Sequence, residues 1–225
     1  MDPRGRLKFR GHRYYSFGTT LHRVLQRFHD SHEAGVVTVR EAMAAVDEDW
    51  VTGGYSNPSE MMEAMGEGKE IIGSYVEAMQ ANPRPGKVLF VEKTLRLELN
   101  DFVLTGRLDR VDELPDGRLE ILDYKTQRGE VTAEEVASDF AMCCYQLLLQ
   151  RAYPDRIVCA TILAVRSMEQ ATTTMTQAEM DEFEFDLSEL GRAILNKNFY
   201  ELVPVAKPLC VGCDFIDYCR LHPDY

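Results

Sequence analysis

The spacing of apolar residues is helical near the start of the chain. Leu21, Val24, Leu25 and Phe28 recur every three or four positions, and residues at this spacing share one face of a helix. The pattern predicts a short amphipathic helix over about residues 16–30.

Helical patterns also fill residues 31–82. Thr38 is a suitable N-cap for a first helix, and Ser56 or Asn57 is suitable for a longer second one, because short polar side chains accept hydrogen bonds from a first turn. We expect this region to be a helical insertion that covers one side of the functional site.

The periodicity changes to alternation in the middle of the chain, which is typical of β-strands. Residues 88–99 alternate up to Asn100–Asp101, a hairpin turn signal. Residues 104–126 then form a second hairpin pattern, which folds at Pro115–Gly117. We therefore expect the sheet to begin with this run of strands.

Strand and helix patterns alternate in the second half. Thr132 and Glu135 form a capping-box signature for a helix that runs to about residue 153. Residues 156–165 predict a buried strand, and a further strand is expected near residues 180–185, followed by a helix capped at residues 186–189. The alternation favours an α/β fold with a central mixed sheet flanked by helices.

Length and composition indicate an ordinary globular protein. The chain has 225 residues, 45% hydrophobic and 28% charged, and we expect residues 1–225 to form one domain. No apolar run is long enough to cross a bilayer, and the basic N-terminus lacks the apolar segment of a secretory signal. A cytoplasmic location with no membrane contact is the default expectation.

The formal net charge of −12 argues at first against a nucleic-acid partner, because binding to phosphates is chiefly electrostatic. The distribution of charge changes this picture. Acidic residues concentrate between positions 47 and 77, whereas the first thirty residues are strongly basic, so a basic DNA track could lie on an acidic body. The alternative for residues 1–13 is a plain basic tail. The basic residues are Arg4, Arg6, Lys8, Arg10, Arg13, Arg23 and Arg27.

The second hairpin carries candidate catalytic chemistry. Asp123 and Lys125 share a strand face with Leu119 and Ile121, because side chains two apart point the same way. Folding at the turn can bring Asp109 beside Asp123. Two carboxylates next to a lysine suit a hard divalent cation such as Mg²⁺ or Mn²⁺. The alternative is that these are ordinary solvent-exposed surface residues, which are common near hairpin turns.

Two segments of this hairpin resemble the core of the PD-(D/E)xK nuclease superfamily, and within it the RecB-like exonucleases, which include CRISPR-associated exonucleases. The segments are Gly106–Asp109 and Ile121–Thr126, and the resemblance extends from about residue 17 to residue 219. It implies a restriction-endonuclease-like core. It also implies that Asp109 and Asp123 bind metal and that Lys125 orients the attacking water.

Further elements of the RecB-like pattern supply additional candidates. Gly18–His22 is similar to the Gly-x-x-x-His element, which implies that His22 is a metal ligand. The backbone carbonyl of Tyr124 is a further candidate ligand. Glu92 begins a strand in a way that resembles the family, so it could support the metal site indirectly, or it could be an ordinary surface glutamate.

The helix after the hairpin departs from the family pattern. RecB-like nucleases carry a Gln-x-x-x-Tyr motif there, and Tyr145 matches its tyrosine, but Ala141 stands where glutamine is expected. Alanine can neither donate to a phosphate nor position a water. Turnover is therefore reduced, or else Gln146 or Gln150 compensates imperfectly.

The C-terminal tail, residues 204–225, contains closely spaced cysteines, Cys210, Cys213 and Cys219. In a cytosolic chain such spacing indicates metal rather than disulfides. The iron–sulfur members of the RecB-like group bind a 4Fe–4S cluster with this triplet and an upstream cysteine, but no cysteine precedes Cys143 here. A zinc site completed by His222 and an empty remnant are the alternatives.

These observations favour a divalent-metal-dependent DNA exonuclease or single-strand nuclease, in which Tyr145 contacts the strand. The second hypothesis is a non-catalytic DNA-binding or assembly module on the nuclease scaffold, motivated by Ala141 and the missing upstream cysteine. The third is a metal-dependent hydrolase for a small phosphorylated substrate. Single-stranded DNA or DNA ends are the expected substrate, and a helicase, a CRISPR integrase or a phage recombination system is the expected partner.

Overall fold

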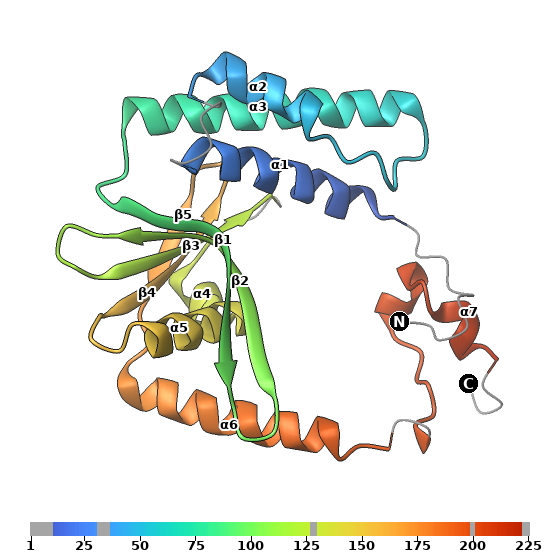
Figure 1. Ribbon diagram of the computed structural model, residues 1–225. Helices are drawn as coiled ribbons and strands as arrows, with labels where there is room; N and C mark the ends of the chain where they lie inside the picture. Colours follow the sequence, from blue (N-terminus) through green and yellow to red (C-terminus); the bar gives the residue numbers. More distant parts are fainter. Residues whose placement is uncertain (1–10, 31–36, 127–129, 199–200, 222–225) are drawn as a thin grey trace.

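A five-stranded sheet with helices on both faces forms the centre of the molecule (Figure 1). The computed structural model describes residues 11–30, 37–126, 130–198 and 201–221. The helices are α1 (Arg13–His29), α2 (Val39–Glu48), α3 (Pro58–Ala81), α4 (Ala133–Ser138), α5 (Phe140–Ala152), α6 (Gln177–Leu195), the 3-10 helix η2 (Pro208–Gly212) and α7 (Ile216–Cys219). The strands are β1 (Lys87–Glu98), β2 (Val103–Glu113), β3 (Leu119–Lys125), β4 (Val158–Ala164) and β5 (Gln170–Thr173).

The sheet is mixed, as the sequence predicted. Its strands lie in the order β1-β2-β3-β4-β5, with antiparallel pairing except between β3 and β4, which are parallel. A parallel pair needs a long crossover, and α4 with α5 provides it. The predicted α/β architecture is therefore confirmed.

Two turns predicted from the sequence connect the first three strands. Leu99 donates its backbone N–H to the carbonyl of Phe102 at 2.9 Å, which closes the turn at Asn100–Asp101. Gly117 has a φ of 88°, the left-handed conformation that glycine adopts without steric cost. The register of β1, β2 and β3 is fixed at these two places.

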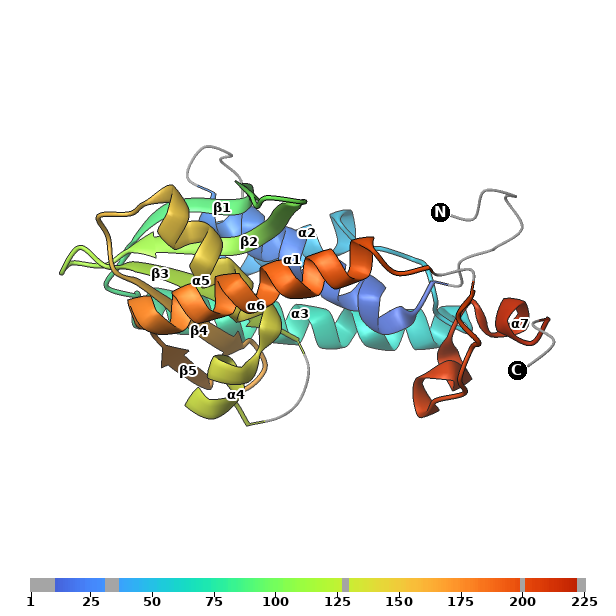
Figure 2. The ribbon, with the colours of Figure 1, turned by 90° about the horizontal axis from the view of Figure 1, so that it is seen from below.

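Helical layers cover the two faces of the sheet (Figures 1 and 2). On one face α1 lies between the sheet and the pair formed by α2 and α3, and on the other α5 lies between the sheet and α6. Each face has its own core of buried side chains. The first core includes Leu21, Ile72 and Tyr124, and the second includes Ile121 and Met142. Ile121 and Tyr124 thus leave β3 on different faces, as alternation requires.

The region predicted as a helical insertion contains α2 and α3, apart from residues 31–36, which lie outside the described residues. Thr38 and Glu41 form a capping box at the start of α2. The side chain of Asn57 accepts the N–H of Glu60 at the start of α3, so Asn57 is the cap and Ser56 is not.

The single helix predicted over residues 132–153 is two helices. Thr132 and Glu135 do form the predicted capping box for α4. Asp139 then leaves the helical conformation, with φ −72° and ψ 115°, and its side chain accepts the N–H of Met142 at 3.0 Å to start α5. An internal aspartate that caps a new helix accounts for the break.

The strand predicted near residues 180–185 is wrong, because these residues lie in α6. The helix begins at a capping box of Thr176 and Glu179, so the cap predicted at 186–189 is also wrong. The polar–apolar alternation over 180–185 imitates a strand, but Met180 and Leu187 are the buried residues of α6, at helical spacing. The strand that the sequence did not predict is β5, a four-residue polar edge strand.

The C-terminal elements η2 and α7 lie apart from the sheet in both views (Figures 1 and 2). In the described chain they pack on one another. Across the described residues, no helix combines the length and the hydropathy needed to cross a bilayer.

Candidate functional site

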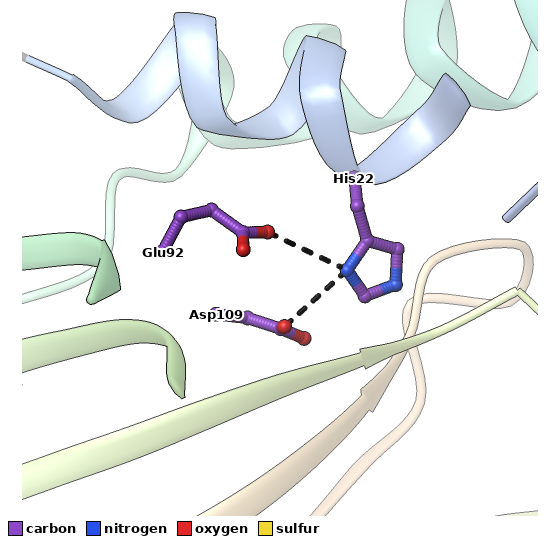
Figure 3. A group of neighbouring side chains, drawn as sticks. All are labelled: His22, Glu92 and Asp109. Atoms are coloured by element: carbon purple, nitrogen blue, oxygen red, sulfur yellow. Dashed lines mark ion pairs between the residues drawn. The ribbon is translucent and has the colours of Figure 1, made fainter. Parts of the chain in front are cut away.

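Three ligand-type side chains from three elements converge at the boundary between α1 and the sheet (Figure 3). His22 comes from α1, Glu92 from β1 and Asp109 from β2. His22 Nδ1 lies 3.3 Å from Asp109 Oδ1 and 3.7 Å from Glu92 Oε1. One nitrogen and two carboxylate oxygens, all within 4.8 Å of one another, form a set that could hold a metal ion.

Helix packing determines where His22 points. Leu21, Val24 and Leu25 on α1 are fully buried against α2 and α3, and they fix the rotation of the helix. His22 lies at the margin of this face, with its ring directed toward the strands. Its Nε2 atom is 3.0 Å from the backbone carbonyl oxygen of Tyr124, the carbonyl that the sequence suggested as a ligand.

Glu92 adopts an unusual backbone conformation that aims its side chain at the site. Its φ is 47°, the left-handed region that residues other than glycine rarely occupy. Such strain costs on the order of 1–3 kcal/mol and persists only where the surroundings enforce it. Arg107 holds the carboxylate in place, with Nε 2.6 Å from Glu92 Oε2.

The two-residue turn between β1 and β2 places Glu92 opposite Asp109, since the flanking pairs are Val91 with Arg110 and Lys93 with Leu108. The sequence therefore contained a signal for Glu92 at the site, although its role was left open. No comparable signal pointed to Arg107, because an exposed strand arginine is common.

Asp109 is oriented by β3. Its Oδ2 atom accepts the backbone N–H of Tyr124 at 2.9 Å, which leaves Oδ1 facing His22. A carboxylate fixed by a backbone donor is already arranged for a cation. The predicted approach of the two hairpin arms at this point is present in the structure.

Asp123 and Lys125 form an ion pair beside the cluster, with Nζ 2.7 Å from Oδ2. Burial and the charge of Asp109 raise the pKa of Asp123 to about 6, although Lys125 and His22 lower it. Burial lowers the pKa of Lys125, but Asp123 outweighs this effect and the net shift is upward, so the ammonium is charged at neutral pH. Asp123 thus lies close enough to Asp109 for the negative charge of Asp109 to raise its pKa.

His22 is held in its protonated form when no cation is present. Burial of the ring lowers its pKa, but hydrogen bonds and negative charge from Asp109 and Glu92 raise it further, to about 10. The positively charged ring balances the charge of the Asp109 and Glu92 carboxylates next to it. A divalent cation would replace this proton, and the donor set of His22, Asp109 and Glu92 fits Mg²⁺ or Mn²⁺ by its oxygen content.

Tyr145 reaches the site from α5. Burial, followed by the charges of Asp123 and Asp109, raises the pKa of its hydroxyl. Gly106 on β2 permits this approach, because a Cβ there would lie 2.6 Å from Leu148 Cδ1 and 3.0 Å from Tyr145 Cδ1. The glycine of the Gly106–Asp109 segment therefore has a packing role.

Neither glutamine near Ala141 is available to compensate for it. Gln146 accepts the backbone N–H of Met175 at 3.0 Å. Gln150 donates to the carbonyls at the end of α5, among them Arg156 O at 2.9 Å. Gln146 is fully buried, and within the described chain its Nε2 has no hydrogen-bond partner, whereas the Gln150 amide is engaged away from the carboxylates. Neither side chain is placed to replace the expected glutamine.

A cavity of about 580 Å³ opens next to the cluster. Basic and acidic side chains line it together: Arg23, Arg107 and Lys125, and also Glu92 and Asp123, with which Arg107 and Lys125 pair. The remaining lining residues include His22, Tyr124 and the exposed Tyr14 and Tyr15. The cavity therefore places cationic groups beside the candidate metal ligands.

The cysteines of the tail lie on η2 and α7 and are partly exposed. Within the described chain, the sulfurs of Cys210, Cys213 and Cys219 do not gather within 4.8 Å of one another. A mononuclear zinc site requires such an approach, given Zn–S bonds of about 2.3 Å. His222, the suggested fourth ligand, lies outside the described residues, as do Arg4, Arg6, Lys8 and Arg10.

Solved structures with related folds are distant. "Crystal structure of SSO0001" matches at 12% identity with a TM-score of 0.36, over 90% of this chain and 84% of the other. A "Putative exonuclease" from Eubacterium rectale matches at 12% identity and TM-score 0.38, over 93% and 91%. Protein VC1899 from Vibrio cholerae matches at 12% and TM-score 0.28, over 80% and 51%.

No curated protein has a sequence that matches this chain. The sequence of residues 3–220 matches the PD-(D/E)XK nuclease superfamily. This span includes His22, Glu92, Asp109, Asp123 and Lys125, and it extends through α7. The chain therefore belongs to the PD-(D/E)XK nuclease superfamily.

Proposed function

We propose that this protein is a divalent-metal-dependent deoxyribonuclease that acts as an exonuclease or single-strand nuclease. The observation that carries the proposal is the convergence of His22, Glu92 and Asp109 beside the Asp123–Lys125 pair. Membership of a nuclease superfamily supports phosphodiester hydrolysis as the reaction. The arginine and lysine side chains in the lining of the adjoining cavity support a nucleic-acid substrate.

His22, Asp109 and Glu92 would hold the cation, with Asp123 as an additional ligand, whereas the Tyr124 carbonyl faces His22 Nε2 on the other side of the ring. When bound, Mg²⁺ or Mn²⁺ supplies positive charge to a phosphoryl oxygen and lowers the pKa of water. Lys125 donates hydrogen bonds to the attacking water and to developing negative charge. Asp123 keeps the Lys125 ammonium in position. Tyr145 contacts the bound strand.

The test is cleavage of end-labelled single-stranded and double-stranded DNA with Mn²⁺. Lys125→Ala and Asp109→Ala should abolish cleavage while the far-ultraviolet circular dichroism spectrum is unchanged. Lys87→Ala is the matched control, because the Lys87 side chain on β1 is exposed. This variant should cleave like the wild type. Equal cleavage by wild type, Lys125→Ala and Asp109→Ala would refute the proposal.

A non-cleaving DNA-binding or assembly module is the second candidate. Ala141 favours it, because Gln146 is fully buried and Gln150 donates to backbone carbonyls elsewhere. In that case DNA binding should fall steeply with salt. The wild type would then bind DNA and leave it intact with every divalent metal.

The placement within the RecB-like group also belongs to the proposal, as does a 4Fe–4S cluster on Cys210, Cys213 and Cys219. Metal analysis after anaerobic purification tests the cluster, and the absence of both iron and zinc would remove it. One nuclease domain over residues 1–225, a cytoplasmic location and a helicase, CRISPR or recombination partner remain predictions.

A further inference from the structure

Two tyrosines at the start of α1 are exposed to an unusual degree for aromatic residues. Tyr14 is 60% exposed and Tyr15 is 68% exposed. Their ring centroids lie 4.8 Å apart, and the ring of His12 stacks on Tyr14 at 5.3 Å with an interplanar angle of 14°. Flat aromatic faces in water carry a solvation cost that a stacked ligand would relieve.

These tyrosines belong to the same cavity as the metal cluster. Tyr14, Gly18 and His22 are spaced four residues apart, so they lie along one face of α1, and all three line the cavity of about 580 Å³. The helical rise separates Tyr14 from His22 by about 12 Å along the axis. Between them, the missing Cβ of Gly18 faces Thr126, whose Oγ1 would lie 3.6 Å from it.

A second cavity, of about 460 Å³, continues from the first. Tyr14 and Thr126 line both, and Phe17 and Tyr55 add aromatic surface to the second. The Tyr55 hydroxyl is buried and has no hydrogen-bond partner within the part of the chain that the structure describes. The second cavity therefore combines apolar faces with an unsatisfied polar atom.

Basic side chains accompany these aromatic groups. Arg23, Arg107 and Lys125 line the first cavity, and Arg13 and Arg166 line the second. Arg13, Arg107, Lys125 and Arg166 each also pair with a carboxylate. Arg166 lies over the ring of Phe17, with Cζ 5.3 Å from its centroid. Alternating aromatic faces and cations are the combination that binds unpaired bases and the phosphates between them.

We infer that Tyr14 and Tyr15 form a stacking platform for the unpaired bases of a single-stranded nucleic acid that passes the metal cluster. The inference rests on the proposed function, in that a phosphate of the same strand lies at His22 and Asp109. Bases in a duplex are stacked on one another and do not offer free faces, so the platform selects single strands or frayed ends.

The experiment measures binding by fluorescence anisotropy with no divalent metal, so that cleavage cannot interfere. The probes are a labelled single-stranded oligonucleotide and one of equal length made of abasic sites, which has the same phosphates but no bases. Tyr14→Ala and Tyr15→Ala should weaken binding of the normal strand about fivefold or more. Binding of the abasic strand should not change. Tyr14→Phe and Tyr15→Phe should bind like the wild type.

Tyr218→Ala is the matched control, because Tyr218 is 61% exposed but lies on α7. It should leave both affinities unchanged. Equal losses for the normal and abasic strands, or no loss in the alanine variants, would overturn the inference.

Cleavage and binding are separate measurements, so the two proposals fail separately. If the wild type binds DNA through the tyrosines but does not cleave it, only the nuclease proposal is refuted. If the wild type cleaves DNA but binding does not depend on Tyr14 and Tyr15, only the platform is refuted. A wild type that does not bind the normal strand would overturn the platform, whereas the nuclease proposal is decided by the cleavage assay alone.

Discussion

At the scale of single residues, Glu92 is the least ordinary feature of the site. Its left-handed backbone and its contact with Arg107 direct a carboxylate toward His22 and Asp109. A surface glutamate would gain nothing from this conformation. The strain is therefore consistent with a direct role in cation binding.

Glu92→Gln should weaken Mn²⁺ binding by about tenfold or more, because a neutral amide replaces a charged oxygen ligand of similar shape. Isothermal titration calorimetry measures the affinity. Glu98→Gln on the same strand, with an exposed side chain, is the control and should bind like the wild type. Identical affinities in the two variants would exclude Glu92 as a ligand.

His29 lies at the other end of α1 in a buried polar network. Its Nε2 atom is 2.7 Å from the Tyr75 hydroxyl, and its Nδ1 atom is 3.0 Å from Arg110 Nη1. Burial, then the positive charges of Arg110 and Arg84, lower the pKa of His29 to about 2. The imidazole is therefore neutral in the folded protein and accepts a hydrogen bond from Arg110.

This depressed pKa makes stability depend on pH. Above about pH 6.5 the imidazole is neutral in both states, but below it the unfolded chain takes up a proton that the folded protein refuses. The free energy of unfolding should then fall by up to about 1.4 kcal/mol per pH unit. Urea denaturation at several pH values should show a smaller slope for His29→Gln. Parallel slopes for the two proteins would contradict the assignment.

At the scale of elements, the contact of α5 with β2 depends on Gly106. A methyl group there would lie 2.6 Å from Leu148 Cδ1, closer than real Cβ atoms approach, and 3.0 Å from the Tyr145 ring, which is a tight contact. The Leu148 side chain must move, and the Tyr145 ring must give way by a few tenths of an ångström. The glycine therefore couples packing to the placement of a candidate catalytic side chain.

Gly106→Ala should lower the free energy of unfolding by about 1–3 kcal/mol, as overpacking does in cores. Urea denaturation measures this change. Gly66→Ala is the control, because Gly66 is a helical position with no atom within 4 Å of an added Cβ. That variant should be neutral or stabilised by up to about 1 kcal/mol. A Gly106→Ala protein as stable as the wild type would show that α5 adjusts freely.

Two elements could not be predicted, because their local sequence patterns are misleading or weak. In residues 180–185, alternating acidic and apolar residues imitate a strand, whereas the capping box at Thr176 starts a helix. β5 has no apolar signal because it is an edge strand that β4 pairs on one side. Tertiary contacts decide both cases, and a local pattern does not contain them.

At the scale of the whole molecule, most of the sheet and much of the candidate site could be predicted. The hairpin turns fix register, so the approach of Asp109 to the end of β3 follows from the sequence. The docking of α1 does not, because nothing in the pattern around His22 states which strand the helix faces. Only the resemblance of Gly18–His22 to the Gly-x-x-x-His element suggested that His22 is a metal ligand.

A bound cation would tie α1 to β1 and β2, so it should stabilise the folded chain. At a concentration one hundred times the dissociation constant, the gain is about 2.7 kcal/mol. For a chain of this length that raises the melting temperature by about 5–10 °C. Differential scanning calorimetry with Mn²⁺ and with EDTA measures the shift. Glu92→Gln should show a smaller shift, and an unchanged melting temperature in the wild type would contradict cation binding.

The wide separation of His22, Glu92 and Asp109 along the chain has a consequence for biosynthesis. The histidine leaves the ribosome long before the hairpin of β1 and β2 exists, and Glu92 and Asp109 reach it only once that hairpin has formed and received α1. An incomplete nascent polypeptide therefore lacks the means to hold a cation here. Cation binding at this place would therefore begin only after α1 has docked on the hairpin of β1 and β2.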